Sequence, residues 1–348
     1  MTKHLCLLGL MTSHTRNGDG YRGQCLTLKH LFEKDGYELT CASTQLNPFL
    51  RLLEMMGAIV KSVGRAKVVV LDIYGGRSFY IEDVVSLWGT IWRRKMIFVF
   101  RGGDLPEFFK RHPGWARRVL RRAFLRVTPS AYLQDSLKEL GFETVVVPNT
   151  IDLSQFDYRQ RVSARPRMLW MRTFHPVYNP EMAVEVLAKV RKKFPEATLT
   201  MAGGDRNYIQ NVKELARRLK VEEGMRFVGF LDAEGKRREM NEADIFLNTN
   251  RIDNMPVSVV EACASGMAVV ATSVGGVPYL LQDQSNGMLV PNENSDAMAS
   301  AVIQLLETPK LAAHVSSGAK TVADCSSWSE VRKKWNALLE MGENREAI

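Results

Sequence analysis

The chain alternates short apolar segments with amphipathic or polar segments along most of its length, and this alternation limits the folds open to it. Twelve segments of four to six residues have the apolar, β-branched character of buried strands, and helix-like segments separate them. Strands that alternate with helices predict parallel sheets with helices on both faces. A length of 348 residues suggests about two domains, so we expect an α/β protein with two doubly wound parallel sheets.

The expected strands divide into two sets of six. In the first half of the chain they are His4–Gly9, Glu38–Cys41, Lys67–Leu71, Met96–Phe100, Leu125–Thr128 and Thr144–Val147. In the second half they are Arg167–Met171, Ala197–Ala202, Met225–Val228, Asp244–Asn248, Ala268–Ala271 and Gly287–Val290. We place the domains at residues 1–160 and 161–325, with the polar, arginine-rich stretch Asp157–Pro166 as the interdomain linker.

Charge and cysteine content exclude several classes of protein. The five cysteines and six histidines include no C-x-x-C or metal-ligand spacing, so neither a disulfide framework nor a zinc site is indicated. No apolar stretch approaches the roughly 18 to 20 residues of a membrane span, and MTKHLCLLGL is too short for a signal peptide. We therefore expect a cytoplasmic protein without a metal or a cofactor.

The net charge of +9 is concentrated in the first domain. Residues 1–160 hold 23 Lys+Arg against 15 Asp+Glu, whereas the remaining residues hold 24 against 23. Much of the excess lies in FFKRHPGWARRVLRRAFLR, in which helical spacing separates an apolar side from Arg117, Arg118, Arg121 and Arg122. A basic amphipathic helix can lie on anionic lipid, but a helix with a core-facing stripe and a solvated basic face explains the pattern equally well. Nucleic-acid binding is less favoured, because no aromatic stacking motif accompanies the charge.

The segment DNMPVSVVE places two carboxylates on either side of a helix start. Asp253 precedes the expected helix, Pro256 suits a first helical position, and Glu261 lies on the helix. Backbone N–H groups around Val257 would face outward, where the helix dipole favours a bound diphosphate. Glu261 could then accept ribose hydroxyls. Without further context, a dipole-complementing Asp253 and a solvated or salt-bridged Glu261 would explain the same residues.

The following residues, ACASGMAVVATSVGGVPYLL, predict a helix that ends at Gly266, a strand, and a glycine pair at Gly275 and Gly276. With DNMPVSVVE, this segment resembles glycosyltransferase family 4, whose members are retaining enzymes that use nucleotide-sugar donors. The resemblance extends over Val147–Pro291. It implies the GT-B architecture, in which two Rossmann-like doubly wound domains face a central cleft, and it implies that a C-terminal helix, residues 326–348, packs back on the first domain.

The resemblance also implies the roles of individual residues. Arg172, Asp253 and Glu261 correspond to catalytic positions: Arg172 binds the diphosphate, Asp253 orients the sugar and Glu261 holds the ribose. The positions expected to bind substrate are Gly18, Gly20, Arg101, Asp104, Asn149, Gly203, Gly204, Phe230, Asn254, Met255, Pro256 and Val257.

The sequence departs from the family pattern at four positions. Arg101 occupies the place of a His that often contacts the transferred sugar. Asp253 is one methylene shorter than the usual Glu, and Tyr279 stands where a Glu usually follows GGVP. The Lys that normally follows the phosphate-binding Arg is missing, with Tyr178 or Asn179 near its place.

These features predict a retaining glycosyltransferase that transfers a hexose-type sugar from a UDP- or GDP-linked donor to a glycan or lipid-linked acceptor in cell-surface polysaccharide synthesis. It would be cytoplasmic, with possible peripheral contact with an anionic membrane. A catalytically weakened nucleotide-sugar-binding partner subunit and a nucleotide-sugar epimerase of the same fold remain alternatives.

Overall fold

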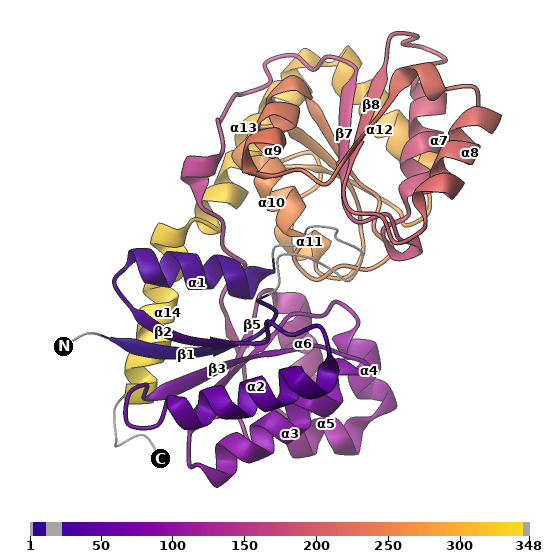
Figure 1. Cartoon of the computed structure of the whole chain (residues 1–348). Coiled ribbons are helices and arrows are strands. Elements are labelled where there is room, and N and C mark those ends of the chain that lie inside the picture. Colours follow the sequence, from indigo (N-terminus) through magenta and orange to yellow (C-terminus); the bar gives the residue numbers. More distant parts are fainter. Residues whose placement is uncertain (1–2, 12–22, 344–348) are drawn as a thin grey trace. The chain divides into compact units, whose positions relative to one another are not determined.

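The computed structural model describes residues 3–11 and 23–343, and the described chain forms two compact units (Figure 1). The first unit contains the described residues up to Thr150 together with those from Trp328 onward, and the second contains Ile151–Ser327. The division lies between Thr150 and Ile151, whereas the sequence placed the boundary after residue 160.

The first unit is built on a parallel sheet of six strands in the order β2-β1-β3-β4-β5-β6. These strands are β1 (His4–Leu8), β2 (Glu38–Ala42), β3 (Val68–Ile73), β4 (Lys95–Phe100), β5 (Leu125–Thr128) and β6 (Val145–Val146). The helices are α1 (Gln24–Lys34), α2 (Pro48–Lys61), α3 (Ser78–Ile91), α4 (Leu105–Arg111), α5 (Pro113–Leu120), α6 (Ala131–Glu139) and α14 (Trp328–Glu343). Trp335 of α14 packs on Phe32 of α1, with ring centroids 6.0 Å apart.

The second unit has a parallel sheet of six strands in the order β12-β11-β10-β7-β8-β9. These strands are β7 (Arg167–Met171), β8 (Thr198–Ala202), β9 (Met225–Gly229), β10 (Ile245–Asn248), β11 (Ala268–Thr272) and β12 (Met288–Val290). The α-helices are α7 (Pro180–Val190), α8 (Ile209–Arg218), α9 (Ala233–Glu242), α10 (Val257–Ala264), α11 (Val277–Leu280), α12 (Ser295–Glu307) and α13 (Pro309–Cys325). Three short 3-10 helices are η1 (Leu153–Gln155), η2 (Pro176–Tyr178) and η3 (Glu222–Gly224).

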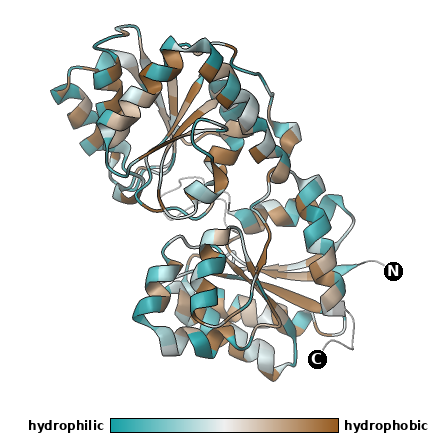
Figure 2. Cartoon of the chain, turned by 180° about the vertical axis from the view of Figure 1, so that it is seen from behind, coloured by the Kyte–Doolittle hydropathy of each residue, from teal (hydrophilic) through white to brown (hydrophobic). Residues whose placement is uncertain are grey.

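Both sheets are buried on two faces, which explains why the strands were recognisable in the sequence. Every residue of β3, β10 and β11 is buried, as expected for parallel strands covered by helices. Figure 2 shows the apolar strands inside each unit, between helices whose polar residues face outward. All twelve predicted strands are present with ends shifted by no more than two residues, and the prediction of two doubly wound parallel sheets is confirmed.

The basic segment expected as one amphipathic helix is divided. Helices α4 and α5 meet at His112, and α5 ends at Leu120, because Pro113 cannot continue the hydrogen bonding of α4. The apolar side of α5 is in the core through Ala116, Val119 and Leu120. Arg118 and Arg122 both pair with Asp83 of α3.

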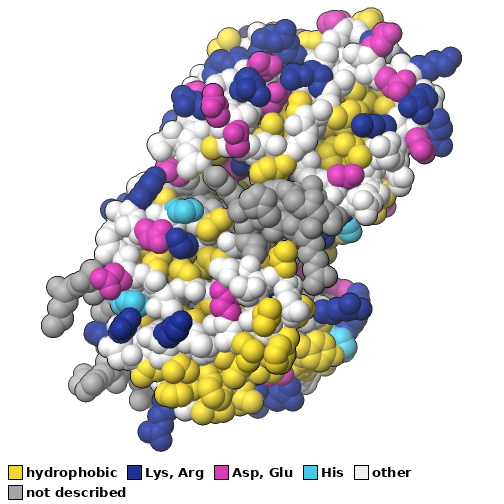
Figure 3. All heavy atoms as spheres, viewed as in Figure 1, with side chains coloured by type: hydrophobic (Ala, Val, Ile, Leu, Met, Phe, Trp, Pro, Cys, Tyr) yellow, Lys and Arg dark blue, Asp and Glu magenta, His cyan; other side chains and the backbone are white. Residues whose placement is uncertain are grey.

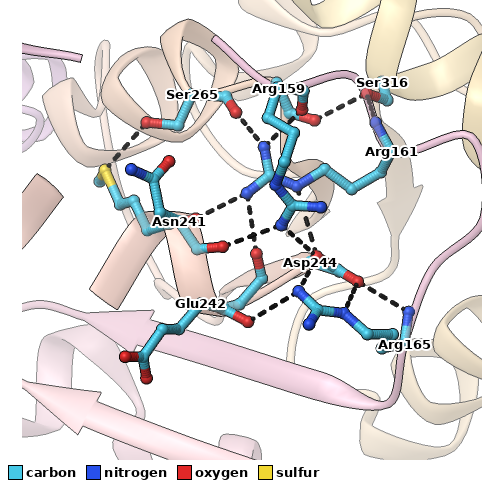
Figure 4. A network of polar contacts seen from close by, with 11 residues as sticks. Arg159, Arg161, Arg165, Asn241, Glu242, Asp244, Ser265 and Ser316 are labelled. Carbon is cyan, nitrogen blue, oxygen red and sulfur yellow. Dashed lines mark hydrogen bonds and ion pairs between the residues drawn. The ribbon is translucent and has the colours of Figure 1, made fainter. Parts of the chain in front are cut away.

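The stretch proposed as a linker is instead attached to the second unit by Asp244, immediately before β10 (Figure 4). The Asp244 carboxylate accepts hydrogen bonds from the guanidinium groups of Arg159, at 2.6 Å, and Arg165, at 2.7 Å. The side chain of Arg161 is fully buried beside Asp244 and donates to the backbone carbonyls of Arg159, Met240, Ala243 and Ser265. Burial alone would raise the pKa of Asp244, but the hydrogen bonds from Arg165 and Arg159 hold it well below its usual range.

Among residues 3–11 and 23–343, each helix is too short or too polar to span a membrane.

Candidate functional site

The strand order of the second unit places a reversal between β7 and β10. From β7 the chain continues to β8 and β9 on one side of the sheet, and β10 begins the other side. Open parallel sheets bind ligands outside the carboxyl ends of their strands at such a reversal. Arg172 follows β7 directly, and the loop Thr249–Pro256 joins β10 to α10. These two segments therefore form the expected ligand edge of the unit.

Arg172 and Asp253 form an ion pair across this reversal, although 81 positions separate them in the sequence. Both side chains are mostly buried. Asp253 Oδ2, which pairs with Arg172, also accepts a hydrogen bond from the side-chain amide of Asn250 at 2.6 Å. The other carboxylate oxygen, Oδ1, accepts the backbone N–H of Asn254 at 2.8 Å. The guanidinium carbon of Arg172 lies 4.8 Å from the centre of the Tyr178 ring. Arg172 is therefore held by the Asp253 carboxylate and the Tyr178 ring, and Asn250 in turn holds Asp253.

Two glycines let the neighbouring loops approach this pair closely. Gly203, after β8, has φ +145°, and a Cβ atom there would collide with the backbone carbonyl of Arg172. Gly275, after β11, has φ +52°, and a Cβ atom there would collide with the backbone carbonyl of Asp253. Gly276 N–H donates to that same carbonyl at 3.0 Å. The glycines predicted from the sequence therefore have a geometric role, because only a residue without Cβ fits at these contacts.

Helix α10 begins at Val257, and Pro256 is its N-cap rather than its first helical residue. Ser258 lies in the first turn, and its hydroxyl is buried without a hydrogen-bond partner among the residues that the structure describes. The same is true of both polar side-chain atoms of Asn248 and of the Asn250 carbonyl oxygen. Buried polar atoms are rarely left unpaired in the absence of a ligand or water.

Sequence reasoning missed Asn248 and Asn250, and it expected only the backbone N–H of Ser258, not its hydroxyl, at the ligand edge. The signal that could have identified Asn248 and Asn250 is the polar Asn-Thr-Asn ending of an otherwise apolar strand.

Glu261 lies on α10 and is mostly buried, but its carboxylate is already engaged. Lys236 of α9 donates to Glu261 Oε1 at 2.5 Å. Glu261 is therefore salt-bridged in this structure, as the alternative interpretation of the sequence expected. A ribose held by Glu261 would share the carboxylate with Lys236, a residue that sequence reasoning did not identify.

The remaining predicted residues of this unit lie along the same edge. The backbone carbonyl of Gly204 accepts from Phe174 N–H at 2.8 Å. Phe230 follows β9 and is 47% exposed, whereas Asn254 and Met255 are buried beside Asp253. Neither residue near the place of the missing Lys supplies a cation: Tyr178 lies against Arg172, and Asn179 is a buried helix cap in left-handed conformation.

In the first unit the predicted residues divide into two groups. Gly18 and Gly20 lie outside the described residues. Arg101 and Asn149 contact each other, with Arg101 Nη1 donating to Asn149 Oδ1 at 2.9 Å, and Arg101 Nε pairs with Asp72 at 3.0 Å. Both charges of the Arg101–Asp72 pair are buried. Arg101 and Asn149 therefore form an internal polar network at the ends of β3 and β4.

Asp104 is exposed and lines a pocket of about 370 Å³ in this unit. The polar side chains that line the pocket include the carboxylates Asp72, Glu82 and Asp104 and the guanidinium of Arg51. Gly9 after β1 and Gly75 after β3 also line it, which places the pocket at the reversal of strand order in this sheet. The acidic lining was not anticipated from the sequence.

Burial raises the pKa of two of these carboxylates. It raises the pKa of Glu82 well above its usual value, although Glu82 accepts the backbone N–H of Tyr74 at 3.0 Å. Burial also raises the pKa of Asp72, an effect that the adjacent Arg101 opposes. Ionisable groups whose pKa is strongly shifted by burial and by a neighbouring charge are found at ligand sites more often than elsewhere.

Most of the second unit matches a family of known proteins. Residues 156–322 match the family described as "Glycosyl transferases group 1", so the family recognised from the sequence is confirmed for this part of the chain. The chain is 29% identical over 206 residues to a phosphatidyl-myo-inositol mannosyltransferase of Mycobacterium tuberculosis, an alignment that covers 56% of this chain and 53% of the relative.

A second relative is a GDP-mannose-dependent alpha-(1-6)-phosphatidylinositol monomannoside mannosyltransferase of Mycolicibacterium smegmatis. It is 28% identical over 162 residues, which cover 44% of this chain and 42% of the relative. The chain thus spans about half the length of the curated relatives it matches.

Solved structures show the same fold over nearly the whole chain. HepE of Anabaena, in complex with UDP, covers 98% of this chain and 100% of its own, with a TM-score of 0.76 at 18% identity. Sucrose-phosphate synthase from Thermosynechococcus elongatus covers 97% and 98%, with a TM-score of 0.80 at 14% identity. The α/β two-domain glycosyltransferase fold, GT-B, is confirmed by these likenesses and by the two parallel sheets.

Proposed function

We propose that the protein transfers a sugar from a nucleotide-diphosphate donor to a hydroxyl group, because residues 156–322 match the family of group 1 glycosyl transferases. The observation that carries the proposal is the Arg172–Asp253 pair at the reversal of strand order in the second unit. Departure of a nucleoside diphosphate places negative charge on a phosphate oxygen, and a pre-positioned guanidinium stabilises that charge in the transition state. Asp253 and Tyr178 hold Arg172 in place before the donor arrives.

The start of α10 would hold the rest of the diphosphate. Its first backbone N–H groups and the Ser258 hydroxyl combine a helix dipole with a neutral donor. Glu261 would accept ribose hydroxyls while Lys236 fixes its orientation. The names of the two mannosyltransferase relatives, one of which specifies GDP-mannose, favour a GDP-linked hexose over a UDP-linked one.

The transfer step balances without a metal or a covalent enzyme intermediate. The bond between the anomeric carbon and the donor phosphate oxygen breaks, and the acceptor oxygen forms the new bond to that carbon. The acceptor proton passes to the departing phosphate on the same face of the sugar, so that the anomeric configuration is retained. Arg172 stabilises the departing phosphate, and Asp253 orients the sugar hydroxyls. In this mechanism no second cation, in the place of the missing Lys, contacts the phosphates.

The pocket of the first unit supports a neutral, hydroxyl-rich acceptor group. Its lining includes three carboxyl groups, which can form hydrogen bonds with sugar or cyclitol hydroxyls. The names of the relatives, which act on phosphatidylinositol or its mannoside, favour an acceptor whose hydroxyl-rich headgroup is attached to lipid. We place the reaction in cell-envelope glycan synthesis at the cytoplasmic face of the membrane.

The decisive experiment compares Arg172→Ala with the wild type in a donor panel. Thermal stabilisation by GDP- and UDP-sugars would identify the donor, because a ligand that binds only the folded state raises its stability by mass action. Release of nucleoside diphosphate in the presence of acceptor would then be measured. We expect Arg172→Ala to lower turnover by about 10²- to 10³-fold, the range found when one donor of a developing oxyanion is removed.

Arg206 provides a matched control, since it lies on the next strand-end loop of the same unit and is exposed. Arg206→Ala should retain wild-type turnover. Equal rates in Arg172→Ala and wild type would refute the role of Arg172.

The alternative of a weakened nucleotide-sugar-binding partner subunit is favoured by one observation, the absence of the second phosphate-binding cation near Tyr178 and Asn179. That alternative predicts donor stabilisation without turnover on any acceptor. An epimerase would convert the donor sugar with no acceptor present.

A further inference from the structure

Helix α3 carries an apolar stripe on the side that faces away from its own core. Its inward residues include Phe79, Val85 and Gly89, which are buried. Tyr80, Val84, Leu87 and Ile91 follow the helical spacing i, i+4, i+7 and i+11 and are 65%, 43%, 47% and 62% exposed. A surface helix normally carries polar residues at such positions, so the outward stripe of α3 needs an explanation.

Helix α2 extends the same apolar surface, because α2 and α3 pack side by side. Its outward positions also carry large apolar side chains, and Leu46 before the helix and Val63 after it add to them. We call the exposed apolar residues of both helices and their flanking turns the α2–α3 surface; they are Leu46, Phe49, Leu50, Leu53, Val60, Val63, Tyr80, Val84, Leu87, Ile91 and Trp92. Figure 3 shows a continuous hydrophobic area over these two helices.

The charges around this surface are almost all positive. Residues 46–103 are described throughout, and none of the four acids among them is exposed. Glu54 accepts backbone N–H groups of the loop before α2, and Asp72 pairs with Arg101. Glu82 accepts the N–H of Tyr74, and Asp83 pairs with Arg122. The exposed cations of the same segment include Lys61, Arg65, Arg77 and Arg93.

The basic helix α5 borders the α2–α3 surface. Tyr80 of α3 lies against Trp115 of α5, with ring centroids 4.6 Å apart, and Arg118 of α5 pairs with Asp83 of α3. Arg117 and Arg121 are exposed on this helix. The arginines whose lipid contact the sequence left open therefore lie at the edge of a larger apolar surface, whose apolar part comes from α2 and α3.

We propose that the α2–α3 surface docks the protein on an anionic lipid bilayer. Large apolar side chains on the outer sides of two helices can enter the boundary between headgroups and acyl chains, while a surrounding set of lysines and arginines attracts anionic headgroups. The one-sided charge distinguishes this occupant from a second copy of the chain, since two identical basic borders would repel each other across a two-fold interface. Docking would bring the acceptor pocket of the same unit to a lipid-borne acceptor, and only this purpose rests on the proposed function.

The test is cosedimentation of the full chain with vesicles of phosphatidylcholine alone and of phosphatidylcholine with phosphatidylglycerol. We expect binding to the anionic vesicles that weakens with salt. The triple variant Leu53→Gln, Leu87→Gln and Ile91→Gln should lower the partition coefficient by about tenfold or more, because it removes apolar area that binding buries.

A matched control replaces three exposed apolar residues elsewhere, Val162→Gln, Leu219→Gln and Met341→Gln, and should bind like the wild type. A charge variant, Lys61→Gln, Arg65→Gln, Arg77→Gln and Arg93→Gln, should lose the preference for phosphatidylglycerol and most of the salt dependence. Thermal unfolding of each variant verifies folding, and the single variant Ile91→Gln should show a smaller loss in the same direction.

The proposal is overturned if the wild type does not bind anionic vesicles, or if the apolar triple variant binds them as the wild type does. It is also overturned if the wild type self-associates through this surface and the triple variant is monomeric with unchanged vesicle binding. Donor stabilisation is measured on the same proteins without lipid. Its absence in the wild type would count against the proposed function alone, whereas its retention in the triple variant would separate docking from catalysis.

Discussion

Replacing Asp244 by asparagine tests how the segment Arg159–Arg165 is attached to the second unit. The Asp244 and Arg161 side chains are 1% and 0% exposed, with the closest charged atoms 3.5 Å apart. Removing one partner of a buried ion pair typically costs ~3–5 kcal/mol, because the other charge is left uncompensated. Arg161 keeps its bonds to four backbone carbonyls, and asparagine retains one acceptor oxygen, so we expect a loss near the lower end, about 3 kcal/mol.

The assay is urea unfolding followed by fluorine NMR of protein labelled with fluorotryptophan. Trp170 is the only tryptophan between residues 151 and 327, and it is buried in β7. Its resonance therefore reports the second unit separately from the five tryptophans of the first. A matched control is Asp157→Asn in the same stretch, since Asp157 pairs with Arg237 at the surface and exposed pairs contribute little.

Acidification gives an independent reading of the same interaction. The hydrogen bonds from Arg165 and Arg159 overcome the effect of burial and lower the pKa of Asp244. A depressed pKa in the folded state stabilises the protein above the unfolded pKa of about 4, and this contribution is lost as the pH falls through the folded value. The gap between wild type and Asp244→Asn should therefore narrow below about pH 4. A loss under about 1 kcal/mol at neutral pH, or an equal loss in Asp157→Asn, would refute the reasoning.

Three further predictions concern the candidate sites. Gly203→Ala should destabilise the second unit by about 1–3 kcal/mol and abolish stabilisation by the donor, because the new Cβ atom would collide with the backbone carbonyl of Arg172. Thermal unfolding with and without donor measures both effects, and the control Gly114→Ala, where space is open, should be neutral. Glu261→Gln should weaken donor binding by about tenfold in calorimetry, since a charged acceptor for the ribose is lost; unchanged affinity would contradict the ribose contact. Glu82→Gln should stabilise the first unit relative to wild type as the pH rises above 4.5, because burial raises the pKa of Glu82 in the folded protein. A carboxyl group with a raised folded-state pKa destabilises the protein at pH values above its unfolded-state pKa. Parallel pH profiles of urea unfolding for the two proteins would contradict this.

Much of the candidate site in the second unit could be identified from the sequence, since its residues follow recognisable strands. Arg172, Gly203 and Phe230 come directly after apolar runs, and in parallel sheets the carboxyl ends of neighbouring strands lie on one edge. The partners of these residues could not be read in the same way. The contact of Glu261 with Lys236 joins two helices whose relative rotation depends on packing against the sheet.

The acidic pocket of the first unit shows a second limit. Asp72 is the fifth residue of the buried strand β3, and Glu82 lies on the inward face of α3. Each was hidden within an otherwise apolar segment, and only folding brings both beside Arg51 and Asp104.

Local pattern alone determined the two sheets of this protein, because a strand buried on both faces must be apolar along its length and so remains visible in the sequence. The tertiary structure decided which charges meet. It paired Arg172 with Asp253, placed Arg161 beside Asp244, and turned the acids near α2 and α3 inward, leaving an apolar surface with a basic border. Those outcomes depend on residues distant in the chain, whose interaction becomes strong only when folding brings them together and removes water.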